Sequence, residues 1–73
     1  MIIKVGQIYK SKLTLTIMVI TQIDDAFEEV SVIASDGFVD RWLFDDIVNC
    51  DWELIIEYPT WQEAVNSKEF KGE

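Results

Sequence analysis

The chain has 73 residues, a hydrophobic fraction of 49% and a formal net charge of −8. Its high apolar content excludes a disordered tail, and its longest aliphatic run, Ile17–Ile20, is too short to cross a bilayer. Eleven of the fourteen carboxylates lie between residues 24 and 57, where Arg41 is the only cation. A field of this sign repels phosphate backbones, so direct nucleic-acid binding is disfavoured.

Two strands are predicted in the first part of the chain. Ile8–Lys10 has the composition of a short strand, and Ser11-Lys12 connects it to a longer one. In the longer strand, apolar residues alternate with threonine and glutamine, a period of two that is typical of a strand with one face toward the core. The alternating apolar residues are Leu13, Leu15, Ile17, Val19 and Ile23.

A β-hairpin is predicted in the middle of the chain. Asp24–Ala26 ends the long strand, and the alternation over Val30–Ser35 predicts the next strand. Asp36-Gly37 follows and is the strongest short-range hairpin signal in the sequence. The returning strand, residues 38–44, is expected to place three aromatic side chains on one face with an aspartate between them: Phe38, Trp42 and Phe44, with Asp40.

The last third of the chain predicts one more strand between two short helical segments. Asp45 can cap a helical turn over Asp46–Asn49, and Trp52–Glu57 alternates as a half-buried strand. Thr60 and Glu63 have the spacing of a capping box, which predicts a helix over residues 61–67. Residues 68–73 are expected to fray, so the predicted single domain spans residues 1–67.

These elements predict a mainly β fold, a small five-stranded antiparallel barrel with a short C-terminal helix. The order resembles an SH3-like barrel, in which a short helical turn separates the fourth and fifth strands. The long first loop and the acidic-aromatic motif of the SH3 domain itself are missing, so the resemblance does not imply binding of proline-rich peptides. Val5–Tyr9 and Trp52–Ala64 also look like small uncharacterised proteins of phages and integrated elements in Gram-positive bacteria. That resemblance implies a mobile-element context and no particular activity.

Catalytic, metal and cofactor chemistry are not expected. The chain has no histidine, and its lone cysteine, Cys50, has acidic neighbours that disfavour a thiolate. The adjacent acid pairs do not have the ligand spacing of a calcium loop, and a domain this small has little room for a deep pocket with two carboxylates. A single cysteine and the absence of a recognisable signal peptide favour the cytoplasm.

The acidic, aromatic-bearing surface predicts a non-enzymatic module that binds a basic protein. The expected partner-binding residues are Asp40, Trp42, Asp45, Asp46, Asp51, Tyr58 and Trp61. The alternative is a nucleic-acid mimic that occupies the basic groove of a DNA-binding protein. Arg41 is expected to pair across the sheet with Glu29 or Glu53. A homodimer is also possible through a strand edge extended by Ile2-Ile3.

Overall fold

The computed structural model describes residues 3–49 and 52–72 and confirms a mainly β chain that ends in short helices. Expected positions that lie outside the described residues are Ile2, Cys50 and Asp51. Along the described chain the elements are β1 (Gln7–Ser11), β2 (Ile17–Asp24), β3 (Glu29–Ala34), β4 (Val39–Leu43), α1 (Phe44–Asn49), β5 (Trp52–Glu57), α2 (Trp61–Val65) and α3 (Lys68–Lys71).

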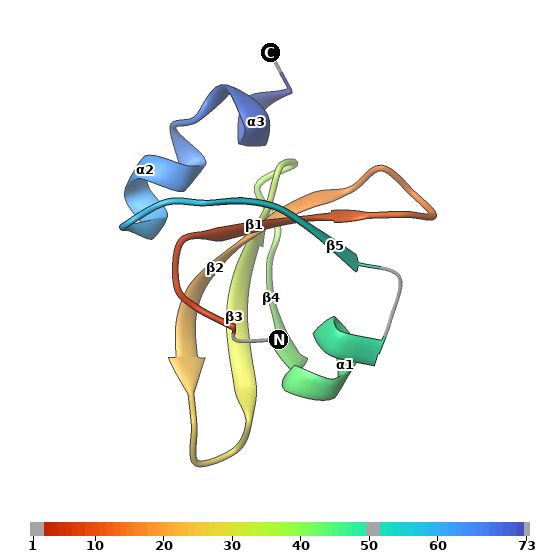
Figure 1. The fold of residues 1–73 in the computed structure, drawn as a ribbon, viewed down its shortest axis with the longest axis vertical. Helices are drawn as coiled ribbons and strands as arrows, with labels where there is room; N and C mark the ends of the chain where they lie inside the picture. The colour runs from red at the N-terminus through yellow and green to blue at the C-terminus, as the bar shows by residue number, and fades with distance from the viewer. Residues whose placement is uncertain (1–2, 50–51, 73) are drawn as a thin grey trace.

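The strands form one antiparallel sheet in the order β4-β3-β2-β1-β5. The sheet is strongly bent, and β1 and β5 run across the direction of β3 and β4 (Figure 1). Over residues 3–49 and 52–72, the outer strands β4 and β5 do not pair with each other. The described strands therefore form an open sheet instead of the expected closed barrel.

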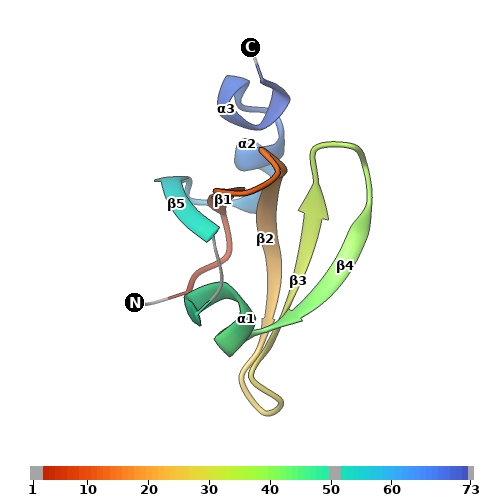
Figure 2. The same cartoon turned by 90° about the vertical axis from the view of Figure 1, so that its right-hand side faces the viewer.

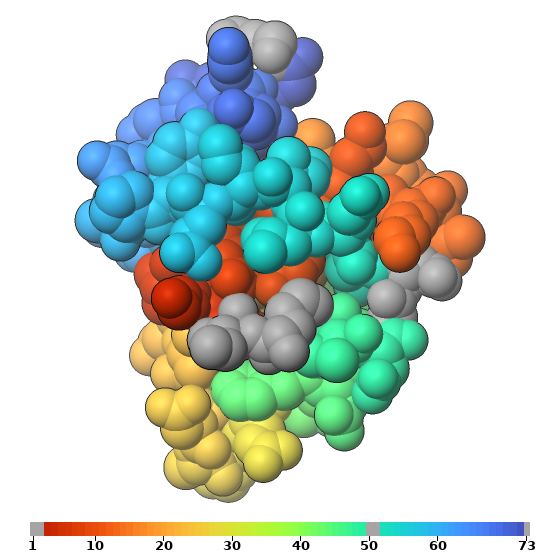
Figure 3. Space-filling view, in the orientation of Figure 1, coloured from red at the N-terminus to blue at the C-terminus, as the bar shows by residue number. Residues whose placement is uncertain are grey.

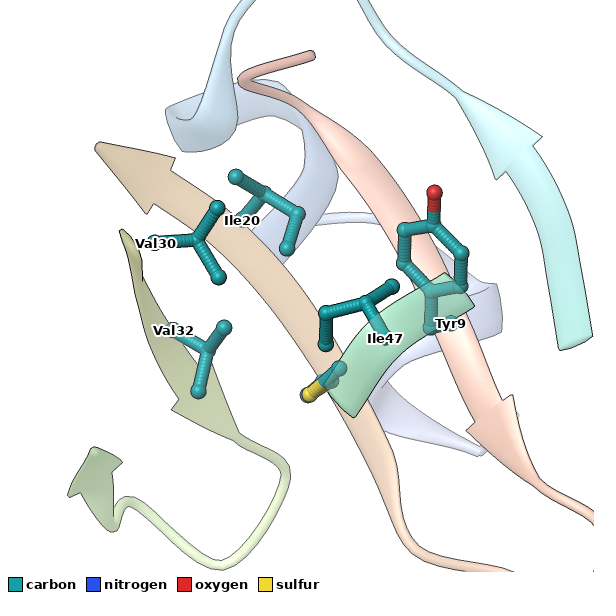
Figure 4. Close-up of a cluster of buried hydrophobic side chains, with 6 residues drawn as sticks. Tyr9, Ile20, Val30, Val32 and Ile47 are labelled. Atoms are coloured by element: carbon teal, nitrogen blue, oxygen red, sulfur yellow. The ribbon is translucent and has the colours of Figure 1, made fainter. Parts of the chain in front are cut away.

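Both faces of this sheet are covered around the first half of β2, where Met18, Val19 and Ile20 are all buried. Face A packs against α1 on one side, and face B packs against α2 and α3 on the other (Figure 2). The face A cluster consists of Tyr9, Met18, Ile20, Val30, Val32 and Ile47, whose labelled side chains converge beneath α1 (Figure 4). The face B cluster consists of Ile8, Val19, Ala64 and Phe70. The expectation that the long strand has one face toward the core is therefore wrong for Met18, Val19 and Ile20, because helices cover this part of the sheet from both sides.

Two β-bulges change which face a side chain occupies. In β2 the register shifts between Ile20 and Gln22, so Thr21 is an extra residue relative to β3. The bulge lets Ile23 pack on face A together with Ile20, although strict alternation would place these two residues on opposite faces. In β5 the extra residue is Ile55, and beyond it Ile56 packs on face B.

The β1–β2 loop begins one residue later than the sequence predicted, after Ser11, and is longer, because β2 does not start until Ile17. The Ser11 hydroxyl accepts hydrogen bonds from the backbone N–H groups of Leu13 and Thr14, both at 3.1 Å, and these bonds turn the chain. Leu13 and Leu15 are 76% and 72% exposed, so their predicted place in a core-facing strand is wrong. The loop projects from the body of the molecule, in orange in Figure 3.

The C-terminal residues are more ordered than expected. Thr60 caps α2 by accepting a hydrogen bond from the backbone N–H of Glu63 at 3.2 Å, which confirms the predicted cap. Residues 68–71, expected to fray, instead form α3, which Ser67 caps through the backbone N–H of Phe70. Phe70 is only 9% exposed and packs on face B, so hydrophobic burial and a cap together stabilise this end.

Candidate functional site

A groove of about 200 Å³ opens on face A, between the β3–β4 hairpin, the start of β2 and the start of β5. Its buried lining includes Met18 and Val32, which belong to the face A core. More exposed residues that line it are Asp36, Phe38, Asp40, Trp42 and Trp52. The groove therefore combines an apolar floor with aromatic and acidic side chains.

The β3–β4 hairpin places the groove residues on one face. In the register of this hairpin, Val30 lies opposite Trp42 and Val32 lies opposite Asp40. Because opposite residues in an antiparallel pair share a face, Asp40 and Trp42 must lie on face A with the two buried valines. This confirms the face predicted for Trp42, and it places the exposed Asp40 on the same face at the rim of the groove.

Two tryptophans bridge the unpaired edges of the sheet. Trp42 comes from β4 and Trp52 from β5, and their rings meet edge-to-face with centroids 6.1 Å apart and planes at 71°. Such a contact is favourable beyond its buried area by roughly 0.5–1.5 kcal/mol. Side chains therefore link the β4 and β5 edges on face A at the point where the groove opens.

The two groove carboxylates are oriented by the backbone. One oxygen of Asp36 accepts a hydrogen bond from the N–H of Phe38 at 3.0 Å, and one oxygen of Asp40 accepts from the N–H of Arg41 at 2.8 Å. Among the described residues, no hydrogen bond to the second oxygen of either carboxylate is found. Each aspartate thus keeps an acceptor for an incoming donor.

No cationic side chain of the described chain lines the groove. Arg41 neighbours Asp40 in sequence, but it lies opposite Ser31 and belongs to the other face of the hairpin. Its guanidinium is 3.8 Å from the Glu29 carboxylate. Of the two predicted partners of Arg41, Glu29 and Glu53, the structure therefore confirms Glu29. The negative charge of the groove is therefore not neutralised from within by the residues that line it.

The predicted partner-binding residues do not form one surface. Asp40 and Trp42 line the groove, whereas Asp45 and Asp46 lie in the first turn of α1 and do not line it. The helix begins at Phe44, one residue before the predicted cap, and the Asp46 carboxylate accepts from the backbone N–H of Leu43 at 3.3 Å. Asp46 thus supports the start of α1.

Tyr58 and Trp61, the remaining described residues of the predicted set, pack on face B against the opposite core cluster. The Tyr58 hydroxyl donates a hydrogen bond of 2.8 Å to the Glu69 carboxylate and ties the end of β5 to α3. This bond raises the pKa of Tyr58 and lowers the pKa of Glu69. Tyr58 and Trp61 therefore lie on a different face from Asp40 and Trp42, and the structure does not bring the predicted partner-binding residues together on one surface.

Sequence reasoning left Asp36, Phe38 and Trp52 out of the predicted set. The spacing of Asp36, Phe38, Asp40 and Trp42 at alternate positions around the Asp-Gly turn was a readable signal that they share a face. The approach of Trp52 had no such signal, because it depends on how far the sheet bends to bring β5 near β4.

A second polar cluster lies between β1 and β5. The buried Tyr9 hydroxyl donates to the side-chain oxygen of Gln7 at 2.9 Å, and the Gln7 amide donates to Glu57 at 3.1 Å. Burial raises the pKa of Tyr9, and the nearby Glu57 carboxylate adds to the effect. These bonds satisfy the buried polar groups of Gln7 and Tyr9 between β1 and β5, so the cluster has a structural explanation.

Residues 3–49 and 52–72 contain no group of three or more side chains arranged to hold a metal ion. No helix in the same ranges has the length and apolar character needed to cross a membrane. Comparison of the chain with protein-family models, with curated proteins and with solved structures finds no significant match.

Proposed function

We propose that this chain is a non-enzymatic interaction module whose face A groove binds a basic side chain of a partner protein. The observation that carries the proposal is the groove itself, which combines an edge-to-face indole pair with two carboxylates that each keep a free acceptor. Aromatic faces attract cations through the ring quadrupole, and carboxylates add a direct charge interaction.

The size of the groove favours a side chain over a small-molecule substrate. Pockets that bind drug-sized ligands and cofactors hold roughly 300–1,000 Å³. The groove here holds about 200 Å³, which suits the end of one long side chain presented on a protein surface. The exposed Phe38 beside it would add apolar contact to the segment that carries that side chain.

The proposal also covers the fold family of the chain and its biological context. The strand order β4-β3-β2-β1-β5, with α1 inserted before β5, supports a relationship to SH3-like barrels in which the Trp42–Trp52 contact takes the place of strand pairing. The resemblance of both ends of the chain to phage and mobile-element proteins supports a partner from a bacterial host or from the element.

The proposal is tested with a fluorescein-labelled peptide that contains lysine and arginine, and a matched peptide with glutamate at those positions. Fluorescence anisotropy at low salt is expected to show binding of the basic peptide alone, weakening as salt is added. Asp40→Asn should weaken binding by about tenfold, because it removes a charge partner of the peptide from the groove.

Asp25→Asn is the matched control. Asp25 carries the same charge but lies in the β2–β3 turn. The groove is at the other end of β2 and β3, so Asp25 does not line it. Equal losses for the two variants would mean that the overall negative charge of the chain controls binding, and would contradict the groove. The variants are compared by circular dichroism to verify that both remain folded.

A further inference from the structure

We infer that the groove selects arginine over lysine. The inference rests on the proposed function and specifies which basic side chain the groove binds. The aromatic walls and the two carboxylates each favour different properties of a cation. An ammonium and a guanidinium carry the same charge, so the selectivity has to come from shape, hydration and hydrogen-bond geometry.

The aromatic walls favour a flat and weakly hydrated ion. The rings of Trp42 and Trp52 lie at 71° to each other, so a planar group stacked on one ring stays in contact with the other. A guanidinium is planar, stacks on aromatic rings and gives up water at lower cost than an ammonium. A lysine ammonium would have to lose a tightly held hydration shell against the apolar floor around Met18 and Val32.

The carboxylates favour an ion with several donors in one plane. Asp36 and Asp40 are each fixed by a backbone N–H through one oxygen, and each has a second oxygen available. The five N–H donors of a guanidinium point outward in its plane, so it can stack on an indole while donating to both carboxylates. The three donors of an ammonium diverge in a cone, so they cannot reach two carboxylates from one flat plane as those of a guanidinium can.

The test uses blocked single residues, N-acetyl-arginine-N-methylamide and its lysine and citrulline counterparts, titrated into the ¹⁵N-labelled full chain. The indole N–H signals of Trp42 and Trp52 report on the groove. Trp61 packs on face B and serves as an internal control. Citrulline has nearly the shape of arginine without its charge.

Arginine is expected to shift the Trp42 and Trp52 signals and leave the Trp61 signal in place, with an affinity about fivefold above that of lysine, the ratio that one additional net hydrogen bond supplies. Asp36→Asn should reduce this ratio, and Asp25→Asn should not. Lysine binding as tightly as arginine would overturn the selectivity and leave the proposed function standing. No shift with either cation, or equal shifts with citrulline, would overturn both.

Discussion

Gly6 is the position where a single methyl group should damage the fold most. Its φ of +93° lies in the left-handed region, and its backbone bonds to two strands: its N–H donates to the carbonyl of Ile20 at 2.9 Å, and its carbonyl accepts from Tyr58 at 3.0 Å. A Cβ at this position would lie less than 3.0 Å from the Tyr58 carbonyl oxygen and 3.3 Å from the carbonyl carbon of Thr60. Both neighbours are backbone atoms, so neither can rotate away.

Gly37 is the matched control for Gly6→Ala. Its φ is +92°, and a Cβ there would meet nothing within 4 Å. Gly37→Ala should therefore cost only the conformational term, about 1–2 kcal/mol. Gly6→Ala should add roughly 1–3 kcal/mol for overpacking and about 1 kcal/mol for a weakened backbone hydrogen bond, about 3–6 kcal/mol in total.

Urea unfolding followed by tryptophan fluorescence measures both losses. A domain of this length has a total unfolding free energy of roughly 4–11 kcal/mol, so Gly6→Ala should be largely unfolded or close to it, and Gly37→Ala should remain folded. Equal losses for the two variants would contradict the close approach of Gly6 to the end of β5.

Three further predictions concern residues that lie outside the groove. Phe70→Ala should lower the unfolding free energy by about 3 kcal/mol because Phe70 is 9% exposed, whereas Phe27→Ala, at a side chain 71% exposed, should change it by less than about 0.5 kcal/mol in the same urea experiment. The hydrogen bond from Tyr58 lowers the pKa of Glu69, so its stabilisation is present above the ordinary glutamate pKa and is lost as pH falls through the folded value. An NMR pH titration of the α3 amides should follow this loss, and Tyr58→Phe should remove it. Arg41→Ala should cost less than about 1 kcal/mol in thermal unfolding, because its side chain is 64% exposed and its ion pair is long.

Local signals predicted the elements well where the chain specifies its own geometry. The Asp36-Gly37 turn, the alternation before it and the Thr60 cap all depend on residues close in sequence, and the structure confirms them. Ser67 and Gly72 are signals of the same kind: a serine cap before α3 and a glycine at φ +75° after it. They were readable in the sequence, and the expectation of a frayed tail overlooked them.

Tertiary packing determined which residues are exposed and which face they occupy where local sequence signals did not. Leu13 and Leu15 continue the alternation of β2, but the Ser11 hydroxyl turns the chain before them and leaves both exposed. The bulges at Thr21 and Ile55 exchange faces without a sequence signature. Each of these features depends on contacts with a neighbouring strand or loop.

The candidate site was also predicted only in part, where local alternation determines which face a side chain occupies. The hairpin register fixed Asp40 and Trp42 on one face, as alternation predicts. Tyr58 and Trp61 had the same aromatic character but pack on face B, and Trp61 is itself the first residue of α2. Composition alone could not separate a groove wall from a helix anchor, because both bury part of a large ring.

Intermolecular nuclear Overhauser effects test the groove most directly. The side-chain protons of a ¹³C-labelled arginine in a short basic peptide should show contacts to the indole protons of both Trp42 and Trp52, and none to Trp61. Contacts confined to Trp61 or to the residues of α1, with none to the groove tryptophans, would contradict face A as the binding surface.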